Sequence, residues 1–169
     1  MILLCCIIGG GQAGGDRGGA EAAHDLGLRR GGMAPKGWRA EDGVIPPWYR
    51  RGMMESASEA YPVRTRANVE ASGGTLILSF GALTEETGSY LTANIARQVG
   101  KPCLHIRLPR ARGPQFQIAA GRIMDFLRHH AIVTLNVAGP RESREPGLQS
   151  AVRVALGEIL GDELGFGGR

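Results

Sequence analysis

The sequence contains very little lysine. Two of its 20 cationic residues are lysines, Lys36 and Lys101, and the others are arginines. The net charge is +4 and the pI is about 9.3, but no block of five or six like charges occurs, which argues against a surface dedicated to nucleic acid. A mildly basic chain suits an anionic small molecule, and arginine provides planar, forked donors for phosphate or carboxylate.

Cysteine is scarce and occurs in an odd number. Cys5, Cys6 and Cys103 form no C-x-x-C pair and have no histidine at zinc-site spacing. The sequence therefore argues against a disulfide-stapled fold and against a zinc site, and we predict no metal bound by side chains. Free thiols of this kind are typical of a reducing compartment.

Long apolar runs are also missing. The apolar segment formed by residues 1–8 is too short to cross a bilayer, and no basic segment precedes it. We therefore expect neither a membrane span nor a signal peptide. Together with the free thiols, this predicts a cytoplasmic protein without a membrane partner.

Glycine, by contrast, is abundant, with 27 of 169 residues. The glycines show no G-X-Y period and lie between apolar segments, which excludes collagen and a low-complexity linker. The hydrophobic fraction of 43% and the charged fraction of 21% are those of a globular chain. Glycines in such a chain belong where the backbone bends tightly or approaches a ligand. We predict one domain over residues 1–161, followed by a short C-terminal tail over residues 162–169.

Short apolar runs alternate with helix-length amphipathic stretches, which is typical of a parallel sheet covered on both faces. Strands are expected at residues 2–8, 30–34, 75–79, 103–108 and 132–137. Helices are expected at residues 16–26, 63–71, 87–99, 114–130 and 146–160. The pattern predicts an α/β fold, a single Rossmann-like, doubly wound domain with a mainly parallel sheet of about five or more strands. Residues 35–62 show little periodicity, and a segment of this length is usually functional or partly helical.

The first predicted strand leads into a glycine-rich loop that opens the first helix. Five of the seven residues 9–15 are glycines, and they include a literal G-x-G-x-x-G. Such a loop lets backbone N–H groups close on a phosphate, and the helix N-terminus adds free donors. We predict that Gly10, Gly11, Gln12 and Gly14 hold a phosphate. A Gly11→Glu substitution is expected to abolish anion binding and leave folding largely intact.

Two charged residues follow this loop, but the acidic residue that a dinucleotide site would have further along the chain is missing. Asp16 is expected to play a positioning role, because an acid stabilises the first turn of a helix, and Arg17 to contact either the ligand or Asp16. A dinucleotide site of the NAD type would also have an acidic residue about 20 positions after the loop. Residues 31–36 are basic instead, so ribose recognition of that type is poorly supported.

Three further loops are expected beside the first, because the carboxyl ends of parallel strands share one crevice. These loops follow the second, third and fifth predicted strands. The candidate site residues in these loops have cationic or hydroxyl side chains that can donate to phosphate, or are glycines. They are Lys36, Arg39, Thr87, Gly88, Ser89, Gly139, Arg141 and Ser143. We predict that all four loops converge on one anion site, and we assign no catalytic residue in it.

Four segments in order resemble the molybdenum carrier family. They read GGGQAGGDRGGAEAAHDLGL, GGMAPKGWRAEDGVIP, YPVRTRANVEASGGTLILS and LNVAGPRES, and the resemblance extends from about residue 7 to residue 160. That family is similar to the molybdenum cofactor carrier proteins, within a Rossmann-like superfamily of nucleotide and ligand sensors. The resemblance implies that the chain binds the molybdenum cofactor (molybdopterin), a pterin with a dithiolene and a terminal phosphate, without transforming it. It also implies a homo-oligomer, a dimer or a tetramer, with molybdoenzymes as recipients of the cofactor.

The chain departs from the family pattern in two loops. The family reads S-G-G-Q-T-G-x-D-R in the first loop, whereas Gly9 and Ala13 replace the two hydroxyl residues here. In the third loop the family has G-G-T, and this chain has T-G-S at residues 87–89. The ligand is therefore expected to carry a phosphate, and it stays open between a pterin cofactor and a nucleotide.

Two relatives in the same superfamily suggest other functions. Cytokinin-activating phosphoribohydrolases carry P-G-G-x-G-T-x-x-E, and Thr92 stands where their glutamate would be. Hydrolysis needs a carboxylate within reach of the glycosidic bond, whereas Glu85 and Glu86 are expected to be solvated loop charges. The DNA-processing protein of natural transformation has a similar first loop and binds single-stranded DNA, which requires aromatic stacking platforms. Aromatic residues make up 5% of this chain, so we favour a carrier over an enzyme and expect no nucleic-acid partner.

Overall fold

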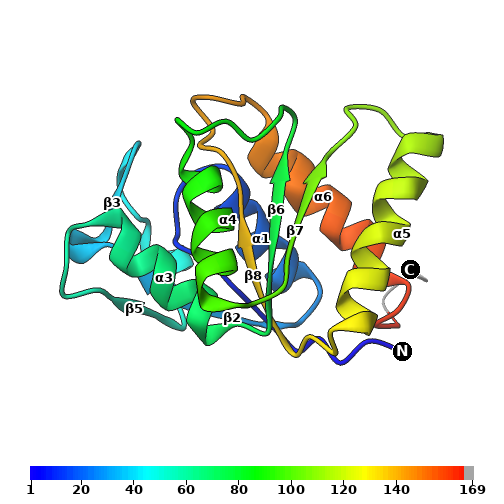
Figure 1. The fold of residues 1–169 in the computed structure, drawn as a ribbon, viewed down its shortest axis with the longest axis horizontal. Helices are drawn as coiled ribbons and strands as arrows, with labels where there is room; N and C mark the ends of the chain where they lie inside the picture. The colour runs from blue at the N-terminus through cyan, green and yellow to red at the C-terminus, as the bar shows by residue number, and fades with distance from the viewer. Residues whose placement is uncertain (166–169) are drawn as a thin grey trace.

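The computed structural model describes residues 1–165 and has three layers, with helices on both faces of one sheet (Figure 1). Six parallel strands form this sheet in the order β5-β2-β1-β8-β6-β7. They are β1 (Cys6–Ile8), β2 (Arg29–Ala34), β5 (Met53–Glu55), β6 (Gly74–Ser79), β7 (Cys103–Arg107) and β8 (Thr134–Ala138). A separate antiparallel hairpin pairs β3 (Arg39–Ala40) with β4 (Gly43–Val44). The predicted α/β fold, Rossmann-like and doubly wound, is confirmed.

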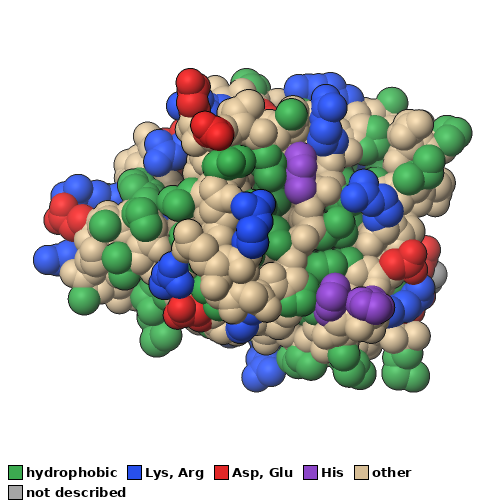
Figure 2. Space-filling view, viewed as in Figure 1, with side chains coloured by type: hydrophobic (Ala, Val, Ile, Leu, Met, Phe, Trp, Pro, Cys, Tyr) green, Lys and Arg blue, Asp and Glu red, His purple; other side chains and the backbone are tan. Residues whose placement is uncertain are grey.

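The helices divide between the two faces of the sheet. Helices α1 (Gly15–Asp25), α5 (Pro114–His129) and α6 (Leu148–Gly161) pack on one face, and α3 (Tyr61–Ala71) and α4 (Gly88–Val99) on the other. In Figure 1, α3 and α4 lie in front of the sheet and α1 and α6 behind it. Figure 2 shows the same side of the molecule, where the Lys and Arg side chains are scattered over the surface and do not form one block. The short helices η1 (Lys36–Trp38) and α2 (Pro47–Arg50) belong to the connection between β2 and β5.

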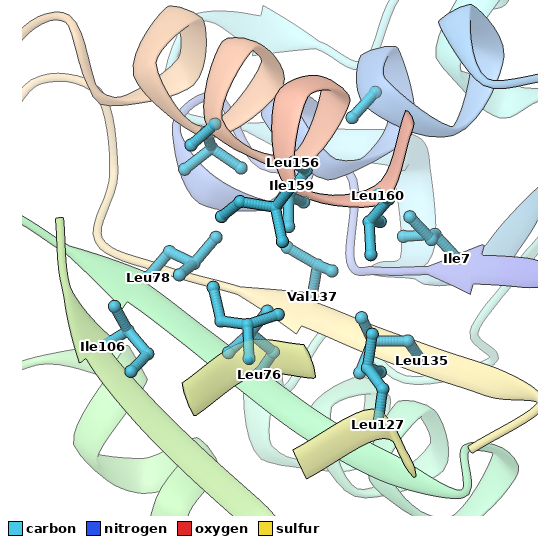
Figure 3. Packing of buried hydrophobic residues seen from close by; sticks show 14 of the residues in the cluster. Ile7, Leu76, Leu78, Ile106, Leu127, Leu135, Val137, Leu156, Ile159 and Leu160 are labelled. Carbon is cyan, nitrogen blue, oxygen red and sulfur yellow. The ribbon is translucent and has the colours of Figure 1, made fainter. Parts of the chain in front are cut away.

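The main hydrophobic core lies between the sheet and the face formed by α1, α5 and α6. Alternate residues of a strand point to the same face, so Leu76 and Leu78 enter this core together. Figure 3 shows them facing Leu156 and Ile159 of α6. The opposite face has a smaller buried cluster, formed by Val69, Ile95 and Ala96 of α3 and α4. The sheet is therefore less filled with apolar side chains beneath α3 and α4, which is where the pocket described below opens.

Local sequence signals account for the helix ends. Helix α4 begins after Thr87, whose Oγ1 accepts a hydrogen bond from the Tyr90 N–H at 3.3 Å, and ends at Gly100, which has a left-handed φ of 74°. Helix α3 begins at Tyr61, two residues earlier than the predicted start. Pro62 fits there because the first turn of a helix needs no N–H partner.

Two predictions about the strands need correction. The first strand was expected over residues 2–8, but only Cys6–Ile8 pair with β2 and β8, because the neighbouring strands begin level with Cys6. Ile2 and Leu4 are nevertheless buried in the core. The connection after β2 contains a sixth strand, β5, which pairs with the end of β2. With three residues, β5 is too short to give a periodic signal.

The last predicted helix ends as α6 at Gly161, and residues 162–165 form a turn. The rest of the predicted tail, residues 166–169, lies outside the described residues. Over residues 1–165, no helix combines the length and the apolar character needed to cross a membrane.

Candidate ligand-binding site

A pocket of about 300 Å³ opens at the carboxyl ends of β1, β8 and β6. The chain leaves β1 toward β2 on one side, whereas β8 returns to lie beside β1 from the other side. Loops diverge at such a reversal of strand order, and ligands of doubly wound folds bind in the crevice between them. The walls of this pocket are the glycine loop, the loop after β8, the start of α4 and one face of α3.

The amino-terminal turn of α4 forms one wall. Thr87 caps this helix and also donates its hydroxyl proton to the Thr84 carbonyl at 2.8 Å. Ser89 is 3% exposed, and its Oγ has no hydrogen-bond partner. A helix N-terminus attracts anions, and here it comes with a buried hydroxyl group that has no partner.

Three arginines line the pocket: Arg64 from α3, and Arg141 and Arg144 from the loop after β8. The guanidinium groups of Arg64 and Arg141 each lie 5.3 Å from the centre of the Tyr61 ring. The carboxylates among the lining residues are Asp16 and Glu86. The lining therefore carries more positive than negative charge, which favours an anionic ligand.

Asp16 joins two walls of the pocket. Its Oδ2 accepts hydrogen bonds from the Gly10 N–H at 3.1 Å, the Gln12 N–H at 3.4 Å and Arg64 Nη1 at 3.3 Å. Burial raises the pKa of the Asp16 carboxyl, while the charge of Arg64 and the two backbone donors act in the opposite direction. This residue ties the glycine loop to α3.

Unsatisfied polar atoms gather at this pocket. Among the described residues, four buried side-chain polar atoms have no hydrogen-bond partner, and three of them belong to residues that line the pocket: Gln12 Oε1, Arg64 Nε and Ser89 Oγ. A buried polar atom without a partner costs about 1–3 kcal/mol, so folded proteins keep few of them. Their concentration around one cavity makes this pocket the candidate ligand-binding site.

The structure brings eight of the sequence-predicted site residues to the pocket. These are Gly10, Gln12, Asp16, Thr87, Gly88, Ser89, Gly139 and Arg141. The other six, which are Gly11, Gly14, Arg17, Lys36, Arg39 and Ser143, are not among the residues that line it. The loops after β1, β6 and β8 converge as predicted, whereas α3 takes the place expected for the loop after β2.

Arg17 holds the β3–β4 hairpin against the glycine loop. Its guanidinium forms a two-pronged ion pair with Asp42, at 2.6 and 2.8 Å, and its Nε donates to the Gly11 carbonyl at 3.0 Å. The same contact lowers the pKa of the Asp42 carboxyl. Arg17 is therefore fully engaged within the protein.

Ser143 and Arg39, two other polar residues predicted for the site, make their contacts at the hairpin. The Ser143 hydroxyl and N–H both donate to the Glu41 carboxylate. Arg39 pairs with Glu59 at 3.5 Å, and its carbonyl accepts from Gln12 Nε2 at 2.8 Å. These contacts fasten the hairpin to two loops that form the pocket, so its residues act on the site from outside.

The glycines of the first loop have packing roles that the sequence did not reveal. A Cβ at Gly14 would lie 2.2 Å from the Pro140 carbonyl oxygen, and a Cβ at Gly15 would lie 2.6 Å from Gly139 Cα. These glycines let the loops after β1 and β8 touch. Gly11 has a φ of 78° and faces Ile45 Cδ1, 2.7 Å from its ideal Cβ position. The expectation that Gly11→Glu would spare the fold is therefore wrong, because a glutamate there meets both strain and a collision.

Sequence analysis missed the contribution of α3. Tyr61, Arg64, Thr65 and Asn68 line the pocket from one face of this helix. Their spacing of three, four and seven positions is that of a single helical face. A polar stripe on a helix that must cover a sheet was the signal available in the sequence.

Within residues 1–165, no three His, Cys, Asp or Glu side chains lie close enough together to hold a metal ion. The lining instead combines cationic side chains, hydroxyl groups, amide side chains and the two carboxylates of Asp16 and Glu86.

Comparison with known proteins agrees with this architecture. The model of the "Circularly permutated YpsA SLOG family", cpYpsA, matches residues 7–160. The chain belongs to this family. The cpYpsA-family chain is also similar to a solved structure, the "Putative molybdenum carrier protein" from Syntrophus aciditrophicus SB at 1.45 Å resolution. The two are 39% identical with a TM-score of 0.84, and the match covers 94% of this chain and 95% of the other.

No curated protein matches the chain. The resemblance predicted from the four sequence segments is confirmed by the family match and by the solved structure. In this cpYpsA-family protein, the pocket lies where doubly wound folds bind their ligands.

Proposed function

We propose that the pocket binds a small molecule with a phosphate group and a heterocyclic ring, and that the protein carries this molecule without transforming it. The observation on which the proposal rests is the unpartnered, buried Ser89 Oγ at the start of α4, in a pocket that Arg141 and Arg144 also line. Phosphate oxygens would accept from the hydroxyl, the helix N–H groups and the guanidinium groups. The whole lining, rather than the glycine loop alone, supports this assignment.

The molybdenum cofactor is the first candidate ligand. Its terminal phosphate fits the donors at α4 and the loop after β8, and its pterin ring fits the amide of Gln12. The dithiolene of the cofactor itself supplies the sulfur ligands of molybdenum. The protein therefore need not ligate the metal and would bind the phosphate and the ring. The similar structure from Syntrophus aciditrophicus SB, named "Putative molybdenum carrier protein", supports this choice over a plain nucleotide.

The contacts of Asp16 favour carriage over catalysis. The Asp16 oxygen that meets Arg64 also accepts two backbone N–H groups, so it is committed to holding the loop. Glu86 lines the pocket, and this observation favours hydrolysis of an N-glycosidic bond as a second candidate function. Incubation with AMP separates the two: release of adenine and ribose 5-phosphate would show a hydrolase, and unchanged AMP is expected of a carrier.

Ligand analysis of the purified protein tests the proposal. The protein would be isolated from cells that make the molybdenum cofactor, then denatured, and the extract assayed for phosphorus, molybdenum and an oxidised fluorescent pterin. We expect pterin and phosphorus in comparable amounts. A bound nucleotide without pterin would refute the cofactor assignment. A protein that carries no phosphorus compound and does not bind inorganic phosphate would refute the proposed function.

A further inference from the structure

The unpartnered polar atoms near Asp16 differ from the Ser89 hydroxyl at α4 in one respect: they include an atom that can only accept a hydrogen bond. Gln12 is 5% exposed, and its Nε2 donates to the Arg39 carbonyl at 2.8 Å. That bond fixes the orientation of the amide, so the atom left without a partner is the oxygen, Oε1. A phosphate dianion offers acceptors only, so it cannot satisfy this oxygen. Gln12 therefore points to another part of the ligand, one that donates a hydrogen bond.

Arg64 supplies the complementary group. Its Nη1 is held by Asp16 at 3.3 Å, and its Nε, a donor, has no partner. Both Gln12 and Arg64 are bound to the same carboxylate oxygen, Gln12 through its backbone N–H and Arg64 through its guanidinium. One buried carboxylate thus holds the two residues that carry the unpaired acceptor and the unpaired donor, and both residues line the pocket.

On the basis of the proposed function, we infer that Asp16 is a positioning residue that sets Gln12 and Arg64 as an acceptor–donor pair for the ring edge of the ligand. The matching edge carries a ring N–H next to a carbonyl oxygen, the lactam edge that guanines and pterins share. Tyr61 also lines the pocket, and the guanidinium groups of Arg64 and Arg141 lie over its ring. The phosphate of the same ligand would lie toward Ser89 and Arg141. The site would then select its ligand by the ring as well as by charge.

Four probes separate ring recognition from anion binding. The full-length protein would be titrated calorimetrically with inorganic phosphate, ribose 5-phosphate, GMP and 1-methyl-GMP, in which a methyl group replaces the ring N–H. We expect GMP to bind at least about tenfold more tightly than ribose 5-phosphate and than 1-methyl-GMP. Ribose 5-phosphate lacks the base and 1-methyl-GMP lacks the ring N–H, so each of these two probes leaves a buried polar group of the site unpaired. Equal affinity for GMP and ribose 5-phosphate would overturn the inference, as would equal affinity for GMP and 1-methyl-GMP.

Variants then test the positioning role of Asp16. In Asp16→Asn and Gln12→Met, the ratio of GMP affinity to phosphate affinity should fall about tenfold. Arg66→Lys is the matched control on the same helix, because Arg66 pairs with Glu70 and Gln98 rather than lining the pocket; it should leave the ratio unchanged. If Asp16→Asn weakens both probes equally, its role is only structural and the inference fails.

These results also separate the inference from the function on which it rests. If wild-type protein does not bind inorganic phosphate, the proposed function itself fails. If phosphate binds but GMP has no advantage over ribose 5-phosphate, the anion site stands and the ring-edge assignment is wrong.

Discussion

Gly10 and Arg64 share one space. A Cβ added at Gly10 would lie 1.4 Å from Arg64 Nη1 and 2.9 Å from Asp16 Oδ2. The missing side chain at position 10 therefore leaves the room in which the guanidinium reaches the carboxylate. A glycine that sequence analysis assigned to a phosphate is thus also required by a contact within the protein.

Substitution of Gly10 by alanine should displace Arg64 from Asp16. The collision is with the end of a flexible side chain, so the fold can accommodate it by moving the guanidinium. We expect GMP affinity to fall about tenfold, as in an Arg64→Lys variant, because the donor is no longer held in place. Calorimetric titration measures the loss of GMP affinity. If the Gly10→Ala protein bound GMP as tightly as the wild type, the placement of the Arg64 guanidinium beside Gly10 would not matter for binding, which would contradict the prediction.

Two hydroxyl residues at the start of α4 should respond in different ways. Thr87→Ala removes the helix cap and should lower the free energy of unfolding by about 1 kcal/mol. Ser89→Ala removes a buried hydroxyl without a partner, so stability should be kept or rise slightly while phosphate affinity falls. Denaturant unfolding and phosphate titration of both variants test this. A loss of stability in Ser89→Ala with unchanged phosphate affinity would contradict the assignment of Ser89 to the ligand.

The Arg17–Asp42 ion pair should make stability depend on pH in the acid range. Asp42 has a lowered pKa in the folded protein because Arg17 donates to it. Its contribution is therefore present above the ordinary aspartate pKa of about 3.9 and is lost as the pH falls through the lower folded value. The difference in unfolding free energy between wild type and Asp42→Asn should shrink as the pH drops below about 4.

The partner substitution provides the control for this pH effect. In an Arg17→Met background, Asp42 has no guanidinium beside it, so Asp42→Asn should no longer change the pH dependence. A pH-dependent difference that persists in this background would show that another group causes it.

Two helix glycines have no packing role and can be replaced. A Cβ at Gly121 of α5 or Gly157 of α6 would meet no heavy atom within 4 Å, and neither has a positive φ. Gly121→Ala and Gly157→Ala should each raise the free energy of unfolding by about 0.5–1 kcal/mol, because alanine loses less backbone entropy in a helix. Thermal unfolding checks this, and Gly15→Ala, which collides with the Gly139 backbone, should be destabilising in the same assay.

The fold was largely predictable because its signals are local. Continuous apolar runs such as that of β6 and the helical spacing in α5 determine element type without reference to the rest of the chain. Strand β5 and the β3–β4 hairpin were not predictable, since they depend on contacts such as Arg17–Asp42 that join residues 25 positions apart. The long segment after β2 proved partly helical, as expected, through η1 and α2.

The site was predictable only where it consists of loops at strand ends. Arg141 and Ser89 follow β8 and β6, and the rule that strand ends share a crevice placed them correctly. Lys36 and Arg39 obey the same pattern but lie outside the pocket, in η1 and at the start of the β3–β4 hairpin. Arg64 was missed because its position depends on how α3 crosses the sheet, which no short motif records.

The most direct test of this account is a crystal structure of the protein with GMP bound. The account predicts the phosphate at the start of α4, within hydrogen-bond distance of Ser89 and Arg141, and the guanine edge against Gln12 and Arg64. A phosphate held by Lys36 and Arg39 at the hairpin, with the pocket beside α4 unused, would contradict it.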